Sequence, residues 1–167
     1  MYTMRPATLS DHDAIERLTA DRFQWMADRG YVPWPQSAAE FASKAGHAPM
    51  WCLLDGDRLC GVTIVVDRLG TAAWTDEERQ EVSRLLTSTV TDPARAGQRL
   101  GVRIASWAVD YTAREGARWV RRVTTEHRLA VYYQEQGFSL VRECEFNGRP
   151  LYALQRPARR LPNPLGN

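Results

Sequence analysis

The chain has 167 residues and a mass of 19.0 kDa, a length that suits one domain able to bury its own core. Hydrophobic residues make up 44% and charged residues 25%, which are ordinary values for a globular protein. The 22 basic and 20 acidic residues give a net charge of +2, so we expect neither a nucleic-acid nor a membrane partner.

Membrane spans, export and metal binding are not indicated either. No apolar run approaches the roughly 20 residues that cross a bilayer, and the N-terminal segment lacks the apolar stretch of a signal peptide. Cys52, Cys60 and Cys144 are odd in number and form no CxxC pair. This pattern argues against a disulfide framework and a zinc site, so we expect no metal and a cytoplasmic location.

The chain begins with a predicted strand and helix. Residues 1–8 predict the strand, and Ser10 with Asp13 predicts the capping box of a helix that Gly30 ends.

A second helix and a hairpin follow. Ser37 and Glu40 predict the capping box of a shorter helix through about Gly46. Residues 50–67 predict two strands around the turn at Asp55-Gly56.

Residues 70–81 are a polar stretch without a predicted element, and residues 82–91 predict a strand that Asp92-Pro93 ends. Apolar residues at helical spacing predict a helix from Gly101 to Gly116.

The last third predicts a strand over "RWVRRVTT", a short helix over "RLAVYYQEQ" that Gly137 closes, and a hairpin around Asn147-Gly148. The order β-α-α-β-β-β-α-β-α-β-β predicts an α/β (α+β) domain with a mixed sheet of about seven strands and about four helices. We expect this domain to cover residues 1–156, and residues 157–167 to form a flexible, basic, Pro-rich tail.

The segment "ARAGQRLGVRIASWA", residues 94–108, runs from a loop with Gly97 and Gly101 into the predicted helix. Free amides and the helix dipole favour an anion at such a helix start. A glycine there, however, more often only marks the boundary of the helix. The loop lacks the Gly-Lys-Ser/Thr ending of a Walker A motif and the three glycines of a dinucleotide fingerprint.

Downstream, "EHRLAVYYQEQGF" places Leu129, Tyr133 and Gly137-Phe138 on a short helix. With these two blocks the chain resembles the GNAT superfamily of acyl-CoA-dependent N-acetyltransferases. That family has an Arg/Gln-x-x-Gly-x-Gly/Ala loop after its fourth strand and Asn-x-x-Ala/Leu-x-x-x-Tyr-x-x-x-Gly-Phe about thirty residues later. The stretches "WTDEER" and "GARWVR" resemble actinobacterial members, and the resemblance covers residues 2–155.

Three positions depart from the family pattern. Ala96 stands where the loop usually has Arg or Gln, Arg99 stands where it usually has Gly, and Glu126 replaces Asn. Gly101 matches. Backbone amides make the main contacts in such a loop, so we expect cofactor binding to survive these changes.

The resemblance implies acetyl-CoA as co-substrate and assigns roles to several residues. The pyrophosphate would lie against the amides of Ala96, Gly97, Gln98, Arg99, Leu100, Gly101 and Val102. The pantetheine would pair with Thr89, Val90 and Thr91. Tyr133 matches the family's general acid and would also contact the cofactor. The alternative interpretation is that Tyr133 is a structural tyrosine of the core.

A general base is harder to assign because residues 82–91 contain no carboxylate and no histidine. Glu126 is the candidate that we retain for the general base. The alternative interpretation is that its carboxylate is only solvated and has no catalytic role. The family builds its acceptor site from the first two helices, which implies substrate contacts from Trp25, Tyr31 and Trp34.

The predicted function is acetyl transfer from acetyl-CoA to a primary amine of a small molecule or peptide, by direct attack in a ternary complex. The alternative is a degenerate GNAT domain that binds acyl-CoA or a partner without catalysis. A third reading keeps the enzyme class but changes the acyl group or the acceptor, for example to an amino-bearing antibiotic. Dimers are frequent in the family, so a homodimer is a further expectation.

Overall fold

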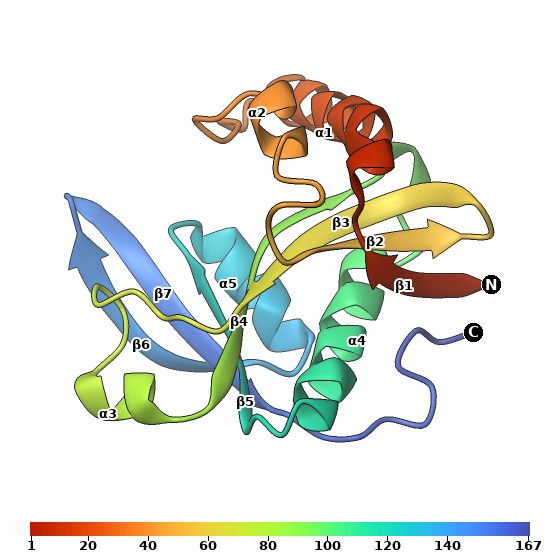
Figure 1. The fold of residues 1–167 in the computed structure, drawn as a ribbon. Helices are drawn as coiled ribbons and strands as arrows, with labels where there is room; N and C mark the ends of the chain where they lie inside the picture. Colours follow the sequence, from red (N-terminus) through yellow and green to blue (C-terminus); the bar gives the residue numbers. More distant parts are fainter. The chain divides into compact units, whose positions relative to one another are not determined.

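Seven strands of the chain form one mixed sheet in the order β1-β2-β3-β4-β5-β7-β6. The structure is a computed structural model that describes residues 1–167 (Figure 1). The strands are β1 (Tyr2–Pro6), β2 (Met50–Asp55), β3 (Arg58–Val66), β4 (Ser83–Thr91), β5 (Trp119–Thr124), β6 (Ser139–Phe146) and β7 (Arg149–Pro157). The helices are α1 (His12–Ala27), α2 (Ala38–Ala42), α3 (Asp76–Gln80), α4 (Leu100–Arg114) and α5 (His127–Glu135). The predicted fold class is confirmed, with five α-helices where about four were expected.

The pairing of the strands follows the turns that connect them. β1, β2 and β3 are antiparallel, and so are β5, β7 and β6. The β6–β7 hairpin turns at Asn147 and Gly148, whose φ angles of 52° and 74° suit the two-residue turn that the sequence predicts. β4 runs parallel to β5, and this pairing covers Ser83–Leu85 and Trp119–Arg121. β4 then continues for six residues beyond that pairing.

The chain divides into two compact units, which are described separately below. The first comprises Met1–Ile64, Ser88–Ile104 and Leu165–Asn167. The second comprises Val65–Thr87 and Ala105–Pro164. Both β4 and α4 therefore contribute residues to each unit.

In the first unit, α1 and α2 pack on one another, and Ile15 and Phe41 are completely buried. Gly61 on β3 permits a close approach of neighbouring elements. A Cβ atom there would lie 3.1 Å from the Val90 carbonyl oxygen and 3.1 Å from the Ile104 Cδ1 atom. The start of α4 and the end of β4 are thereby held against β3.

In the second unit, Ala73, Trp74, Leu151 and Ala153 form a buried cluster. Arg121 on β5 is also completely buried. Its guanidinium pairs with the Glu81 carboxylate and donates to the Gln155 Oε1 atom at 3.1 Å, and it lies 4.8 Å from the centroid of the Trp74 ring. These partners compensate the burial of its charge.

Two local predictions were wrong. The polar stretch over residues 70–81 contains α3, because Thr75 and Glu78 form a reciprocal capping box. The capping box near the first helix is formed by Thr8 and Asp11, two residues before the predicted Ser10, and it starts a short 3₁₀ turn that leads into α1.

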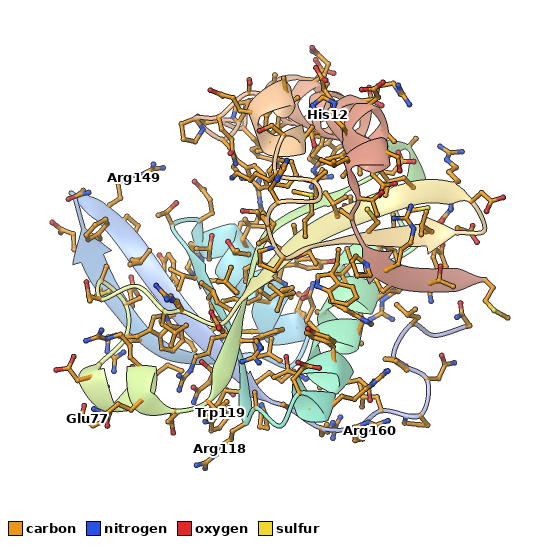
Figure 2. All side chains as sticks on the ribbon, viewed as in Figure 1. His12, Glu77, Arg118, Trp119, Arg149 and Arg160 are labelled. Carbon is orange, nitrogen blue, oxygen red and sulfur yellow. The ribbon has the colours of Figure 1, made fainter.

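The C-terminal segment makes specific contacts within each unit. In the second unit, the Arg160 Nε and the Leu161 N–H donate to one carboxylate oxygen of Asp110, at 3.1 and 2.8 Å. Figure 2 labels the Arg160 side chain. In the first unit, the Arg103 guanidinium donates to the Leu165 and Gly166 carbonyl oxygens. The flexibility of residues 157–167 stays a prediction. No helix has both the length and the apolar character that a membrane crossing requires.

Candidate functional site

The loop that precedes α4 has a backbone shape that ordinary residues rarely adopt. Gly97 has a φ of 90° and Arg99 a φ of 56°, both in the left-handed region. The family pattern has glycine where this chain has Arg99, and the arginine adopts the conformation that glycine adopts most easily. Its side chain is exposed.

Several donors at the start of α4 have no partner inside the helix. The first helical hydrogen bond runs from the Arg103 N–H to the Arg99 carbonyl at 3.0 Å. The N–H groups of Leu100, Gly101 and Val102 therefore lie in the first turn, where no earlier helical carbonyl can accept them. With the positive end of the helix dipole, these groups fit a phosphate-bearing ligand.

The amides of two other predicted contact residues are used inside the loop. The Ala96 N–H donates to the Pro93 carbonyl at 3.3 Å, and the Gln98 N–H donates to the Arg95 carbonyl at 3.2 Å. The donors that fit a phosphate are accordingly those of the first turn of α4.

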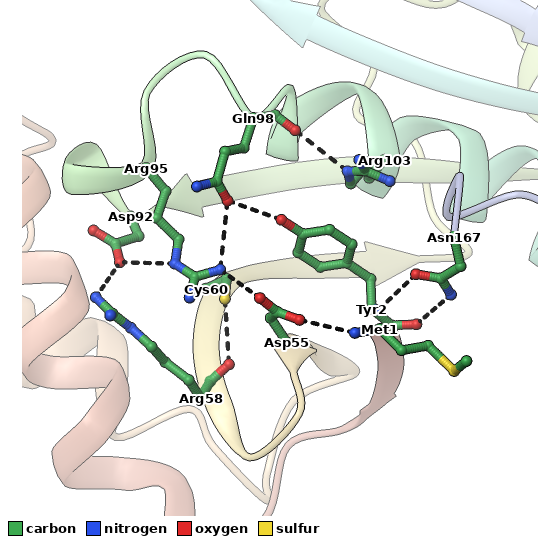
Figure 3. A network of polar contacts seen from close by, with 10 residues as sticks. All are labelled: Met1, Tyr2, Asp55, Arg58, Cys60, Asp92, Arg95, Gln98, Arg103 and Asn167. Carbon is green, nitrogen blue, oxygen red and sulfur yellow. Dashed lines mark hydrogen bonds and ion pairs between the residues drawn. The ribbon is translucent and has the colours of Figure 1, made fainter.

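A polar network within the first unit fixes this loop (Figure 3). Arg95 pairs with Asp55 at 2.9 Å, which ties the loop to the end of β2. The Gln98 Oε1 atom accepts from the Tyr2 hydroxyl at 2.9 Å, which ties it to β1. The Arg103 guanidinium lies 4.3 Å from the centroid of the Tyr2 ring. Tyr2, Asp55 and Arg103 were missed in the sequence because these contacts join distant segments.

The predicted pantetheine strand, Thr89–Thr91, is the last part of β4. Ser88 immediately before it has a φ of 49°, so the strand changes its backbone direction there. The Thr89 and Thr63 hydroxyls lie 2.8 Å apart, and Val90 is buried. These contacts hold the segment against β3.

In the second unit, the Tyr-x-x-x-Gly-Phe block has a clear structural role. The Phe138 N–H donates to the Tyr133 carbonyl at 3.1 Å, and the Gly137 N–H donates to the Gln134 carbonyl at 2.9 Å. Gly137 has a φ of 88°. These three features define a Schellman motif, with the rings of Tyr133 and Phe138 packed at 6.4 Å between centroids. The motif fixes the helix end that carries Tyr133.

Arg122 on β5 lies against Tyr133 and was also missed in the sequence. Its guanidinium carbon is 3.8 Å from the centroid of the Tyr133 ring. Burial lowers the pKa of Arg122, while the nearby phenols of Tyr133 and Tyr132 act in the opposite direction. Two adjacent arginines, Arg121 and Arg122, within a predicted core strand are the sequence signal that could have indicated a role for Arg122.

Glu126 is the N-cap residue of α5 and is exposed. One of its carboxylate oxygens lies 3.8 Å from the Arg149 guanidinium, and both side chains are more than half exposed. The carboxylate is therefore solvated and weakly paired. Its role as a general base stays a prediction.

The three aromatic residues predicted to contact the acceptor divide between two groups. Trp25 packs with Tyr31 at 6.0 Å between ring centroids, and the Arg22 and Arg29 guanidinium carbons lie 4.3 and 4.1 Å from the centroid of its ring. Trp34 makes edge contacts with Phe23 at 5.8 Å and with Phe41 at 5.3 Å. Trp34 thus helps to join α1 and α2, because Phe41 is completely buried on α2.

The fold is similar to that of solved acetyltransferases. A GNAT-family acetyltransferase from Listeria monocytogenes superposes with a TM-score of 0.76 at 18% identity, covering 93% of this chain and 94% of that one. The YncA protein of Salmonella typhimurium, solved with acetyl-CoA, gives 0.63 at 15% identity and covers 99% of each chain. An aminoglycoside 6'-acetyltransferase type Ii gives 0.65 at 14% identity, with 96% and 99% covered.

These likenesses concern three-dimensional structure. No protein-family model matches the sequence, and no curated protein matches it. The chain has the GNAT fold, which confirms the fold that the two sequence blocks predicted.

Proposed function

We propose that the chain is an N-acetyltransferase that moves the acetyl group of acetyl-CoA to a primary amine. The backbone of residues 97–102 carries this proposal. Its left-handed turns at Gly97 and Arg99 lead into the free amides of α4, which suit a pyrophosphate. The loop lies between β4 and α4, which agrees with the place of the cofactor loop in the family pattern that the sequence resembles.

In the proposed reaction, the neutral amine attacks the thioester carbonyl carbon. The new C–N bond forms, the C–S bond breaks, and its electron pair leaves with the sulfur. The Tyr133 hydroxyl gives its proton to the departing thiolate. The amine loses its extra proton to Glu126 or to water. A backbone amide of residues 89–91 would polarise the carbonyl oxygen.

The acceptor we propose is a small-molecule amine or a peptide amino group. The aminoglycoside 6'-acetyltransferase of similar fold supports a small amine. Trp25 and Tyr31 would contact the acceptor, with Arg22 and Arg29 beside the Trp25 ring. Trp34 would support this contact through α1 and α2 rather than touch the acceptor itself.

The alternative is a domain that binds acyl-CoA without turnover. The exposure of Glu126 favours it, because a solvated carboxylate that is only weakly paired with Arg149 is not held in a defined position for proton transfer. β4 itself has no carboxylate and no histidine.

Calorimetric titration with acetyl-CoA, beside free CoA and ATP, tests the cofactor part. We expect micromolar binding of both CoA compounds and none of ATP. A thiol-release assay with an aminoglycoside, a polyamine, an aromatic amine and an alanine-initiated peptide then tests transfer. Binding without thiol release on any amine would select the alternative, and an absence of binding at millimolar acetyl-CoA would overturn both readings.

A further inference from the structure

The second unit contains a buried arginine that the proposed reaction does not use. Arg122 is 4% exposed, and its neighbour Arg121 points to the other face of β5. The Glu81 carboxylate compensates the charge of Arg121. Arg122 instead lies over aromatic rings, with its guanidinium carbon 3.8 Å from the Tyr133 centroid and 5.8 Å from the Phe138 centroid.

Removing a guanidinium from water is unfavourable unless partners repay the loss of hydration, and the face of the Tyr133 ring is one such partner. The Gln136 Oε1 atom accepts a long hydrogen bond of 3.5 Å from Arg122. The ionisable groups that act on its charge are the phenols of Tyr133 and Tyr132.

The contact also limits the motion of Tyr133. The Schellman motif fixes the backbone of Tyr133, and the Phe138 ring packs on its side chain. The guanidinium lies over the face of the Tyr133 ring, so the ring cannot turn without losing the cation–π contact.

We propose that Arg122 is a positioning residue for Tyr133 in the acetyl transfer. It holds the ring plane, and with it the direction of the hydroxyl. It also stabilises the negative charge on the Tyr133 oxygen after the proton has passed to the departing sulfur. The proton released by the amine then restores the phenol. This inference rests on the proposed function.

The test compares Arg122→Met with Arg122→Lys, using acetyl-CoA and the panel amine with the highest turnover. We expect Arg122→Met to lower kcat by about tenfold or more, while KM and Kd for acetyl-CoA stay within about twofold. Arg122→Lys should recover part of kcat, because the charge is kept and the planar fork is lost. Arg122→Met keeps an unbranched side chain of similar length at this buried position, and thermal unfolding verifies that the variant folds.

A double-mutant cycle with Tyr133→Phe separates positioning from a general structural role. If Arg122 acts through Tyr133, Arg122→Met has almost no further effect on kcat once the hydroxyl is gone. Independent multiplication of the two losses would overturn the proposal. An unchanged kcat in Arg122→Met, or a loss found only in KM, would overturn it as well.

A spectroscopic readout tests the contact without turnover. The Arg122 Nε–H proton should be shifted upfield by the ring current of Tyr133, and Tyr133→Leu should remove that shift while Tyr132→Leu should not. An Nε–H resonance that is unchanged in Tyr133→Leu would overturn the proposal. A wild-type protein without transfer to any amine would instead mean that the proposed function fails, and the inference with it.

Discussion

Phe138 donates its backbone N–H to the Tyr133 carbonyl, five residues earlier, at 3.1 Å. This bond is possible because Gly137 between them has a φ of 88°. The Tyr-x-x-x-Gly-Phe spacing is therefore a requirement of the helix end, and it determines where α5 presents Tyr133.

We expect Gly137→Ala to lower the free energy of unfolding by about 1–2 kcal/mol, because an L-residue is strained at this φ. The new Cβ would also lie 3.3 Å from the Arg156 Nε atom. Chemical denaturation measures the change. Gly70→Ala is the matched control, since Gly70 has open space around it and should change stability by less than about 0.5 kcal/mol. Equal stability of the two variants would contradict the assignment of the motif.

Arg99 offers a paired test of the loop. Arg99→Gly should raise the free energy of unfolding by about 0.5–1 kcal/mol, because glycine adopts a φ of 56° without strain. Arg99→Ala keeps the strain and should give no such gain. Both variants lose the exposed cation, so both should bind acetyl-CoA a few times more weakly, with a reduced dependence on salt. Denaturation and calorimetry measure the two effects, and a gain in Arg99→Ala would refute the strain argument.

Tyr133→Phe tests the proposed role of Tyr133 as general acid. The variant keeps the ring over Arg122 and loses only the hydroxyl, so we expect kcat to fall about a hundredfold with acetyl-CoA affinity unchanged. Tyr132→Phe is the control, because Tyr132 is exposed and lies on another side of the helix. Steady-state kinetics with calorimetry distinguish the two. Full turnover in Tyr133→Phe would remove Tyr133 from the mechanism.

Much of the fold could be predicted because its signals are local. The capping box of Ser37 and Glu40 and the turns at Asp55-Gly56 and Asn147-Gly148 depend on neighbouring residues alone. α3 has the same local signal in Thr75 and Glu78 and was missed because it has only five residues. Arg142 supports it from a distance, since it pairs with Glu78 at 3.0 Å and donates to the Ala73 carbonyl at 2.9 Å.

The sequence motifs predicted which residues belong to the candidate site, but not the residues that pack against them. Alternation along a strand predicts that one of two adjacent arginines faces solvent. Arg121 and Arg122 are both buried, because Trp74 and Glu81 cover one face of β5 and Tyr133 and Phe138 cover the other. Partners that lie far apart in the chain are not visible in any local pattern.

The pair of Arg5 and Asp11 makes stability depend on pH. Two hydrogen bonds of 2.7 Å from the Arg5 guanidinium hold the pKa of the Asp11 carboxyl well below its usual range, and the Thr8 amide adds to this. Because the pKa is lower in the folded protein than the usual value of about 3.9, the stabilisation is complete above that value. It is lost as the pH falls toward the lowered pKa.

Asp11→Asn should therefore cost about 1–2 kcal/mol at pH 7 and progressively less below about pH 4. Unfolding free energies measured from pH 7 to pH 2 give the comparison. Asp13→Asn is the control, since the Asp13 side chain is 82% exposed and should contribute little at any pH. A constant difference between wild type and Asp11→Asn across this range would contradict the pairing.

Arg121 and Arg118 both lie near the Glu81 carboxylate. Arg121 is buried in the second unit, and Arg118 is exposed on its surface. Arg121→Met removes the donor to the Glu81 carboxylate, the Glu78 carbonyl and Gln155, so we expect a loss of about 2 kcal/mol or more. Arg118 is 72% exposed and lies 4.0 Å from the same carboxylate, so Arg118→Met should cost less than about 1 kcal/mol. Thermal and denaturant unfolding of the two variants test this difference. Similar losses would mean that the buried guanidinium stabilises the second unit no more than a surface charge does.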